Sequence, residues 1–225
     1  MRHSLYFLFK WILICALLSI TFACGDENED GYPPIYWNSK HLHNCYTIPD
    51  SFSHVKWHIV PSRRRDSFAI GFSIKGDIIY SDECKVPKNT ELFDSICQLY
   101  HDTAWHGESS ATNPPIAFPV SDISIISDAD FDVVHPAGSD LIDFATVRTE
   151  SWGDFVLNGY PINDTHLVYI SKKFSDFTYN EKCLWWDGGI SLVFPLPTLS
   201  TTHHLTISIT FEGGKKISST IEVIL

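Results

Sequence analysis

Three carboxylates alternate along residues 128–132, the spacing with which EF-hand calcium loops begin. Alternate side chains of such a loop can direct their oxygens at one hard cation. A complete loop also needs glycine at its sixth position and glutamate at its twelfth, where this chain has Val133 and Ser139, so an EF-hand is excluded. Two interpretations stay open: a looser calcium site completed by Asp140 or Asp143, and a polar turn after a strand. The three carboxylates are Asp128, Asp130 and Asp132.

Histidines occur in close pairs along the chain, and paired histidines can ligate zinc. No HExxH segment is present, and no cysteine–histidine spacing matches a zinc motif. His41 and His43 are the best-placed pair, because residues two apart on a strand share a face. We expect scattered surface and half-buried histidines, with no metal ion and no cofactor. The pairs are His41/His43, His54/His58, His101/His106 and His203/His204.

The sequence also lacks motifs for a catalytic nucleophile. There is no GxSxG segment and no glycine-rich phosphate loop. A catalytic pair of carboxylates cannot be selected from 27 acidic residues without geometry. These observations favour a protein that is not an enzyme and leave a hydrolase as the weaker alternative.

Two adjacent tryptophans, Trp185 and Trp186, precede a glycine-rich turn. If they lie on a strand, one ring points into the core and the other outward, because side chains alternate along a strand. An exposed tryptophan is a stacking platform for sugars and a common hot spot for protein partners. The pair is therefore the candidate ligand platform, and the alternative is that loops cover both rings.

The first residues have the organisation of a secretory leader. Arg2 and Lys10 precede 13 mostly apolar residues, 11–23. A helix of this length spans about 20 Å, and a bilayer core is about 30 Å thick. The run is therefore better explained as part of a signal peptide, residues 1–23, than as a membrane span. An uncleaved anchor stays open if the run extends back to Leu5, which would bury Lys10.

The end of this run, TFACG (21–25), resembles a bacterial lipobox, in which signal peptidase cuts before a cysteine that carries lipid. Ala23 and Gly25 match the pattern, whereas the first two positions depart from it. Four carboxylates follow within six residues, and residues 24–34 are predicted to form a solvated acidic tether. The tether resembles the surface-export signal of Bacteroidetes lipoproteins. These resemblances imply lipidation at Cys24 and anchoring in the outer membrane, exposed at the cell surface; the alternative is ordinary cleavage that releases a secreted protein.

Charge and length limit the classes of function. The chain has 16 basic and 27 acidic residues, and the leader holds two of the basic ones, so the net charge of −11 becomes −13 after cleavage. No basic face for nucleic acid stands out, so we expect no nucleic-acid partner. About 200 remaining residues suit one large domain or two small ones. The β-rich region 35–225 has a candidate boundary at 108–115, ESSATNPP.

Four cysteines follow Cys24, an even number that permits two disulfides in an exported chain. Three pairings are open, and no CxxC spacing indicates a redox or zinc site. The alternative is that all four are buried free thiols. They are Cys45, Cys84, Cys97 and Cys183.

The C-terminus predicts a β-hairpin. Apolar and polar residues alternate along 205–211 and 217–225, with the apolar residues at odd numbers in both segments. Facing residues of an antiparallel pair share a face, which requires a three-residue loop, Glu212-Gly213-Gly214, with its last glycine at positive φ. The resulting pairs are Ile209–Ile217 and Leu205–Ile221.

Other segments predict a mainly β protein with one or two short helices. Residues 68–74 and 78–80 have a common parity around Lys75-Gly76-Asp77, which predicts a second hairpin. An apolar stripe at helical spacing predicts a helix over 92–100. Many strands separated by turns favour an antiparallel β-sandwich, Ig-like or related. Further strands are expected at 54–60, 121–127, 154–157, 166–171, 183–186 and 190–194.

The segment ISIISDADFDVVHPAGSDL (123–141), together with the C-terminal hairpin (205–225), resembles an uncharacterised family of Bacteroidetes outer-membrane lipoproteins. The resemblance covers most of the mature chain and implies a cell-envelope location. The family has no known activity, so no site residue is transferred from it.

Three hypotheses for function follow. The first is a non-catalytic binding or accessory module, held in the outer membrane by its lipid, with a glycan or protein ligand. The second is a fimbrial subunit, in which the terminal strand would be exchanged between copies. The third, the hydrolase, requires a concave pocket with convergent acids or a histidine dyad.

Overall fold

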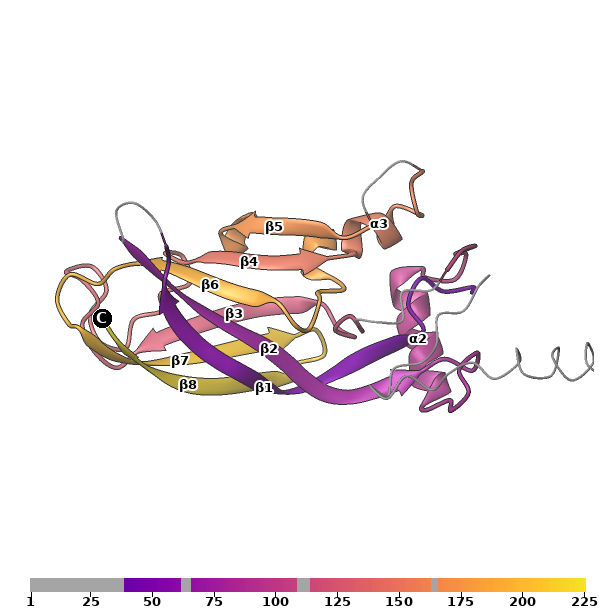
Figure 1. Cartoon of the computed structure of the whole chain (residues 1–225), viewed down its shortest axis with the longest axis horizontal. Coiled ribbons are helices and arrows are strands. Elements are labelled where there is room, and N and C mark those ends of the chain that lie inside the picture. Colours follow the sequence, from indigo (N-terminus) through magenta and orange to yellow (C-terminus); the bar gives the residue numbers. More distant parts are fainter. Residues whose placement is uncertain (1–38, 62–65, 109–113, 163–165) are drawn as a thin grey trace, which may run out of the picture. The chain divides into compact units, whose positions relative to one another are not determined.

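The computed structural model describes residues 39–61, 66–108, 114–162 and 166–225 (Figure 1). The signal peptide 1–23, Cys24 and the tether 24–34 lie outside the described residues, as does most of the candidate boundary at 108–115. Residues Ile35–Leu225 form one compact unit. Within the described part of the chain, no helix is long and apolar enough to cross a membrane.

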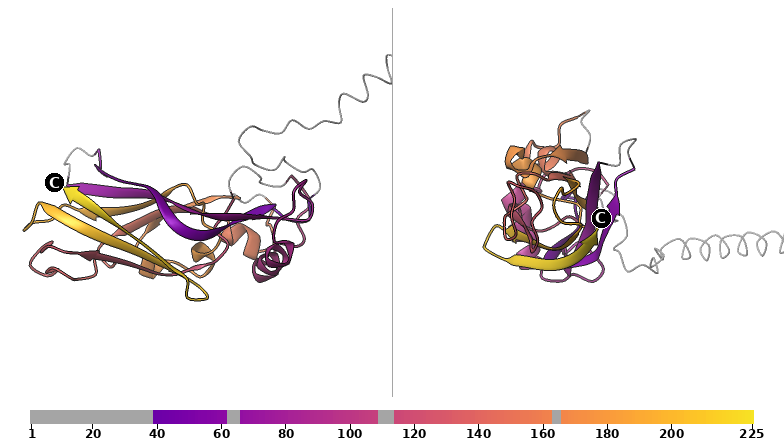
Figure 2. Two further views of the ribbon diagram at one scale, coloured as in Figure 1. Left: turned by 90° about the horizontal axis from the view of Figure 1, so that it is seen from below. Right: turned by 90° about the vertical axis from the view of Figure 1, so that its left-hand side faces the viewer.

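Two antiparallel sheets face each other, which confirms the expected mainly β sandwich (Figures 1 and 2). The larger sheet has five strands, in the order β1 (Cys45–Ile59), β2 (Ser67–Tyr80), β6 (Ile190–Pro195), β4 (Thr146–Ser151) and β5 (Val168–Lys172). The smaller sheet has three, in the order β3 (Val120–Ser127), β7 (Thr202–Phe211) and β8 (Lys216–Ile224).

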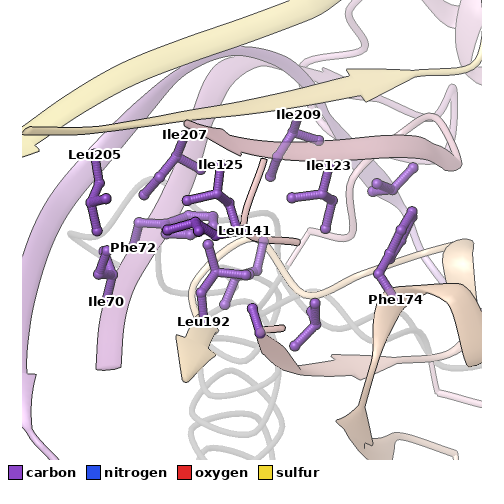
Figure 3. Close-up of a cluster of buried hydrophobic side chains, with 14 of the residues drawn as sticks. Ile70, Phe72, Ile123, Ile125, Leu141, Phe174, Leu192, Leu205, Ile207 and Ile209 are labelled. Atoms are coloured by element: carbon purple, nitrogen blue, oxygen red, sulfur yellow. The ribbon is translucent and has the colours of Figure 1, made fainter. Parts of the chain in front are cut away.

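The main core lies between the two sheets (Figure 3). Ile70 and Leu192 come from the larger sheet, and Ile125 and Ile207 face them from the smaller one. Alternation along each strand sends every second side chain into this layer. Each fully buried side chain of this size contributes about 1.5–3 kcal/mol, so burial of the two apolar faces is the main force holding the sheets together.

The C-terminal hairpin has the predicted register. Leu205 pairs with Ile221 and Ile209 pairs with Ile217. Gly214, at the end of the loop, has a φ of 85°, a conformation that glycine adopts without strain. The parity of the apolar residues therefore selected both the loop length and the face that is buried.

The second predicted hairpin is wrong, because β2 continues through residues 75–77 without a turn. Gly76 lies opposite Pro49 of β1, beside an irregularity in the register. A Cβ built on Gly76 would lie 1.7 Å from the carbonyl oxygen of Ile48. This glycine therefore allows two strands to approach closely, a role that a sequence cannot distinguish from a turn.

We expect the change Gly76→Ala to destabilise the protein by about 1–3 kcal/mol or more, because the new methyl group meets backbone that has no free rotation. Gly71→Ala is the matched control, since it lies on the same strand and its Cβ would have nothing within 4 Å. That control should be neutral or slightly stabilising. Urea unfolding measures both changes, and equal effects at the two glycines would contradict the close approach.

Four of the six other predicted strands are confirmed, two are wrong, and one observed strand was not predicted. The predicted segments 54–60, 121–127, 166–171 and 190–194 overlap β1, β3, β5 and β6. Residues 154–157 lie instead in a helix, α3 (Gly153–Leu157), and residues 183–186 form only isolated bridges. Strand β4 was not predicted, because two of its three buried residues, Thr149 and Ser151, are polar and hide the alternation.

The predicted helix is confirmed as α2 (Thr90–Tyr100). It buries Phe93, Ile96, Cys97 and Tyr100, which recur at helical spacing. Two short 3₁₀ turns, η1 (Phe174–Asp176) and η2 (Asn180–Lys182), complete the described elements.

Candidate functional site

Helices α2 and α3 cover a second apolar cluster, separate from the core between the sheets. We call it the second core. Its largest buried side chains include Tyr46 from β1, Phe93 and Tyr100 from α2, and Phe155 from α3. The second core also contains a buried carboxylate that accepts several hydrogen bonds.

That group is Asp102, whose carboxylate is completely buried just after the end of α2. Its Oδ1 accepts hydrogen bonds from the Leu42 N–H at 2.7 Å and the Tyr160 hydroxyl at 2.6 Å. Its Oδ2 accepts them from the Tyr46 hydroxyl at 3.1 Å and the His43 N–H at 3.3 Å. A buried carboxylate must find such partners, because burial without them is strongly unfavourable.

His43 is also completely buried, with its Nδ1 3.7 Å from Asp102 Oδ2. Burial acts to raise the pKa of Asp102, but His43, the Tyr160 hydroxyl and the Leu42 N–H together hold that pKa below its ordinary value. An Asp–His pair can serve catalysis only where a substrate reaches it. Since neither side chain is exposed, we interpret the Asp102 carboxylate, with its four donors, as an internal brace.

Beside the second core lies a cluster of four rings, from Trp105, Phe155, Tyr160 and His166, which we call the aromatic cluster. The ring centroid of Trp105 lies 5.2 Å from that of Tyr160, 5.7 Å from that of His166 and 5.9 Å from that of Phe155. The rings of Phe155 and His166 stack at 4.2 Å. These are the separations at which aromatic side chains attract one another.

The four side chains of the aromatic cluster differ in how far they are exposed to solvent. Phe155 is buried, Trp105 and Tyr160 are half-buried, and His166 is exposed. The indole N–H of Trp105 donates to the backbone oxygen of Glu108 at 2.9 Å, which fixes the ring. The Trp105 N–H and the Tyr160 hydroxyl are bonded within the protein, so the cluster offers a ligand the faces of these rings and the exposed imidazole of His166. Rigid aromatic surface beside a polar group is the combination found at binding hot spots.

The two adjacent tryptophans point in different ways, although they do not lie on a strand. Trp185 is buried, and its N–H donates to the backbone oxygen of Glu181 at 2.6 Å. Trp186 is half-buried beneath its own turn, since a Cβ on Gly188 or Gly189 would come within 3.0 Å of its ring. Trp105 is half-buried as well, and a Cβ on Gly107 would come within 2.7 Å of its ring, so exposure does not separate the two tryptophans. What distinguishes Trp105 is its three aromatic neighbours, with ring centroids 5.2 to 5.9 Å away.

The aspartates of the 128–132 run, and Asp140 after it, accept hydrogen bonds from backbone N–H groups of the adjoining loop and strands. This use is typical of turns built by aspartate, and it fits the polar-turn interpretation of the run. Among the described residues, no group of three or more potential ligands could hold a metal ion. The bonds are Asp128–His204 N (2.7 Å), Asp130–Ala137 N (2.8 Å), Asp132–Val134 N (2.8 Å) and Asp140–Ile125 N (2.9 Å).

Two of the four histidine pairs, His41/His43 and His203/His204, are separated by burial, whereas both members of the other two pairs are exposed. On β7, His203 is buried between Ser127 and Ser200, at 2.9 Å from each, whereas His204 is exposed and contacts Asp128. His41 and His43 precede β1 rather than sharing a strand face. The pairing in sequence thus reflects alternation and turns instead of a common ligand set.

The four cysteines are buried free thiols in the structure, which corresponds to the alternative to disulfides. Burial is the main cause that raises the pKa of Cys45 and of Cys183 to about 12 in each case, and the pKa values of Cys84 and Cys97 are raised as well. The reactive thiolate form is therefore scarce near neutral pH.

We expect all four thiols to resist alkylation in the folded protein and to react after unfolding without a reductant, because reaction requires both access and thiolate. Peptide mass spectrometry after labelling with iodoacetamide measures each position separately. A cysteine that becomes reactive only after reduction would show that a disulfide forms in the exported protein.

Sequence reasoning missed the aromatic cluster. Its members come from two segments, 105 and 155–166, which have no shared periodicity. Trp105 lies between His101 and His106, two residues before Gly107, and this local density of aromatic residues and glycine was the only signal in the sequence. Their proximity arises from packing of α3 against the segment after α2.

No protein-family model matches this chain, and searches of the curated proteins and of the solved structures found no match either. The resemblance to Bacteroidetes lipoproteins therefore stays a prediction.

Proposed function

We propose that this protein is a non-catalytic binding module, held in the outer membrane by a lipid on Cys24, and that it binds a glycan at the aromatic cluster. The observation that carries the proposal is the half-buried pair of rings from Trp105 and Tyr160, whose centroids lie 5.2 Å apart, with Tyr160 bonded to the buried Asp102 carboxylate. Rigid aromatic surface beside polar atoms suits the apolar faces and hydroxyl groups of sugars.

The arrangement of β8 favours a binding module over a fimbrial subunit. Strand β8 is paired with β7 continuously, from Ile224 opposite Thr202 to Lys216 opposite Thr210. Donating this strand to another copy would expose Ile217 and Val223, which are buried.

The glycan hypothesis can be tested on the purified protein with a glycan array, followed by titration calorimetry with the strongest ligand. We expect Trp105→Ala to weaken binding at least about tenfold, which corresponds to ~1.4 kcal/mol. Trp57→Ala is the matched control, because Trp57 is another half-buried tryptophan but packs on the main core. Absence of any bound glycan, or equal weakening by both variants, would reject the proposal.

Lipidation can be tested separately by metabolic labelling with an alkynyl fatty acid in a bacterium that processes lipoproteins. We expect Cys24→Ala to abolish the label and to release the protein from the outer-membrane fraction. Cys15→Ala, within the apolar run, is the control that should keep both. A label that survives Cys24→Ala would contradict the proposed anchor.

A further inference from the structure

Tyr160 connects the aromatic cluster with the buried Asp102 carboxylate. Its hydroxyl donates to Asp102 Oδ1 at 2.6 Å, and its ring contacts both Trp105 and Phe155, with centroids 5.2 and 5.7 Å away. One side chain thus has its polar end in the second core and its ring at the surface.

We propose that Asp102, acting through the Tyr160 hydroxyl, is the positioning residue of the ligand site. The bond to Asp102 fixes the position of the Tyr160 ring, and contact with that ring fixes the orientation of the Trp105 ring toward a ligand. The expected effect on ligand affinity rests on the proposed function. The effect on the position of the Trp105 ring does not, because that position can be measured without a ligand.

The backbone of Tyr160 supports this role. Its φ is 58°, in the left-handed region that a bulky residue rarely adopts, and it follows Gly159 at a φ of 75°. Such a conformation persists only where the surrounding structure holds it. A hydrogen bond to an ionised carboxylate is stronger than one between neutral groups, so the Asp102 bond is suited to hold Tyr160 in place.

Asp102 is rigid enough to act as the fixed point. Three further donors, Leu42 N–H, His43 N–H and the Tyr46 hydroxyl, hold its two oxygens at 2.7 to 3.3 Å. Its own N–H donates to the Cys97 carbonyl at the end of α2, at 2.8 Å. Because the carboxylate is held from several sides, Tyr160 must adjust to Asp102 and not the reverse.

Tyr46 offers a matched control within the same bond network. Like Tyr160, it donates a phenol hydrogen to Asp102. Its ring, however, packs on Phe93 and His43 inside the second core, with centroids 5.3 and 6.0 Å away. Removing either hydroxyl costs Asp102 one donor, but only Tyr160 belongs to the aromatic cluster.

The experiment labels the whole protein with 5-fluorotryptophan and follows the fluorine NMR signal of Trp105, assigned with Trp105→Phe. We expect Tyr160→Phe to shift or broaden this signal and to weaken glycan binding about tenfold, whereas Tyr46→Phe changes affinity less than about twofold and leaves the signal in place. Asp102→Asn should move the same signal, and adding Tyr160→Phe to it should weaken binding no further, because both act through one bond.

An unmoved Trp105 signal in Tyr160→Phe, or an equal change in Tyr46→Phe, would overturn the positioning role. A moved signal in a protein that binds no glycan on the array would keep the positioning role and reject the proposed function instead.

Discussion

Replacing Trp185 with alanine is expected to lower the free energy of unfolding by about 3–5 kcal/mol, one of the largest losses available to a single substitution in this chain. The side chain is buried and lies against Phe174 and Phe177, with ring centroids 6.4 and 5.9 Å away. Its N–H also donates to Glu181 at 2.6 Å. Truncation therefore removes packing on two rings and leaves a carbonyl without its donor.

Trp186→Ala is the internal control for this substitution, because the two residues are adjacent and differ in burial. We expect it to cost about 1–2 kcal/mol, since a half-buried ring removes less apolar surface from water. Urea unfolding curves followed by circular dichroism measure both values. A loss at Trp186 as large as that at Trp185 would contradict the assignment of one core ring and one partly exposed ring.

The second large effect is expected for Asp102→Asn, which should lower the free energy of unfolding by about 3 kcal/mol at neutral pH. The carboxylate accepts four hydrogen bonds, from Leu42, His43, Tyr46 and Tyr160. An asparagine keeps one acceptor oxygen and turns an NH₂ group toward donors. At least one buried donor is then left unpaired, which is the costly case.

The loss of unfolding free energy caused by Asp102→Asn should depend on pH in a defined direction. The folded protein holds the pKa of Asp102 below its ordinary value of 3.8, so the ionised carboxylate stabilises the fold fully above pH 3.8. That contribution disappears as the pH falls below 3.8 through the lower folded pKa. The difference between wild type and Asp102→Asn should therefore be constant near neutral pH and shrink in acid.

Unfolding measurements at several pH values between 7 and 3 would show this trend, with the exposed Asp122→Asn as a control of small effect. A difference that grows in acid would mean that folding raises the pKa of Asp102, and a constant difference would mean that folding does not shift it; both results contradict a pKa held below its ordinary value. The interpretation of Asp102 as a charged brace would then be wrong.

Local alternation was enough to determine parts of the smaller sheet. In β7 and β8 the apolar residues keep one parity on both sides of the loop, and a one-residue slip would turn every side chain to the other face. The register and loop length followed from that single constraint. Helix α2 was predictable for a similar reason, because its buried residues recur at helical spacing.

Where a residue's role depends on what lies across from it, the sequence was insufficient. Lys75-Gly76-Asp77 has turn composition, but the position of Ile48 across the sheet makes Gly76 a point of close approach. Buried and half-buried residues alternate along β4, but the sequence shows no alternation of apolar and polar residues, because the buried Thr149 and Ser151 are polar. Only tertiary packing places these two side chains inside.

The candidate site belongs to this second category. The sequence was enough to predict the alternating strands and to single out the adjacent tryptophans, because both are local signals. Only the tertiary structure brought Trp105 beside Tyr160 and buried Asp102 beneath them, 58 residues from the tyrosine it binds. A contact over that separation leaves no period in the sequence, since it is decided by how α3 packs on the segment that follows α2.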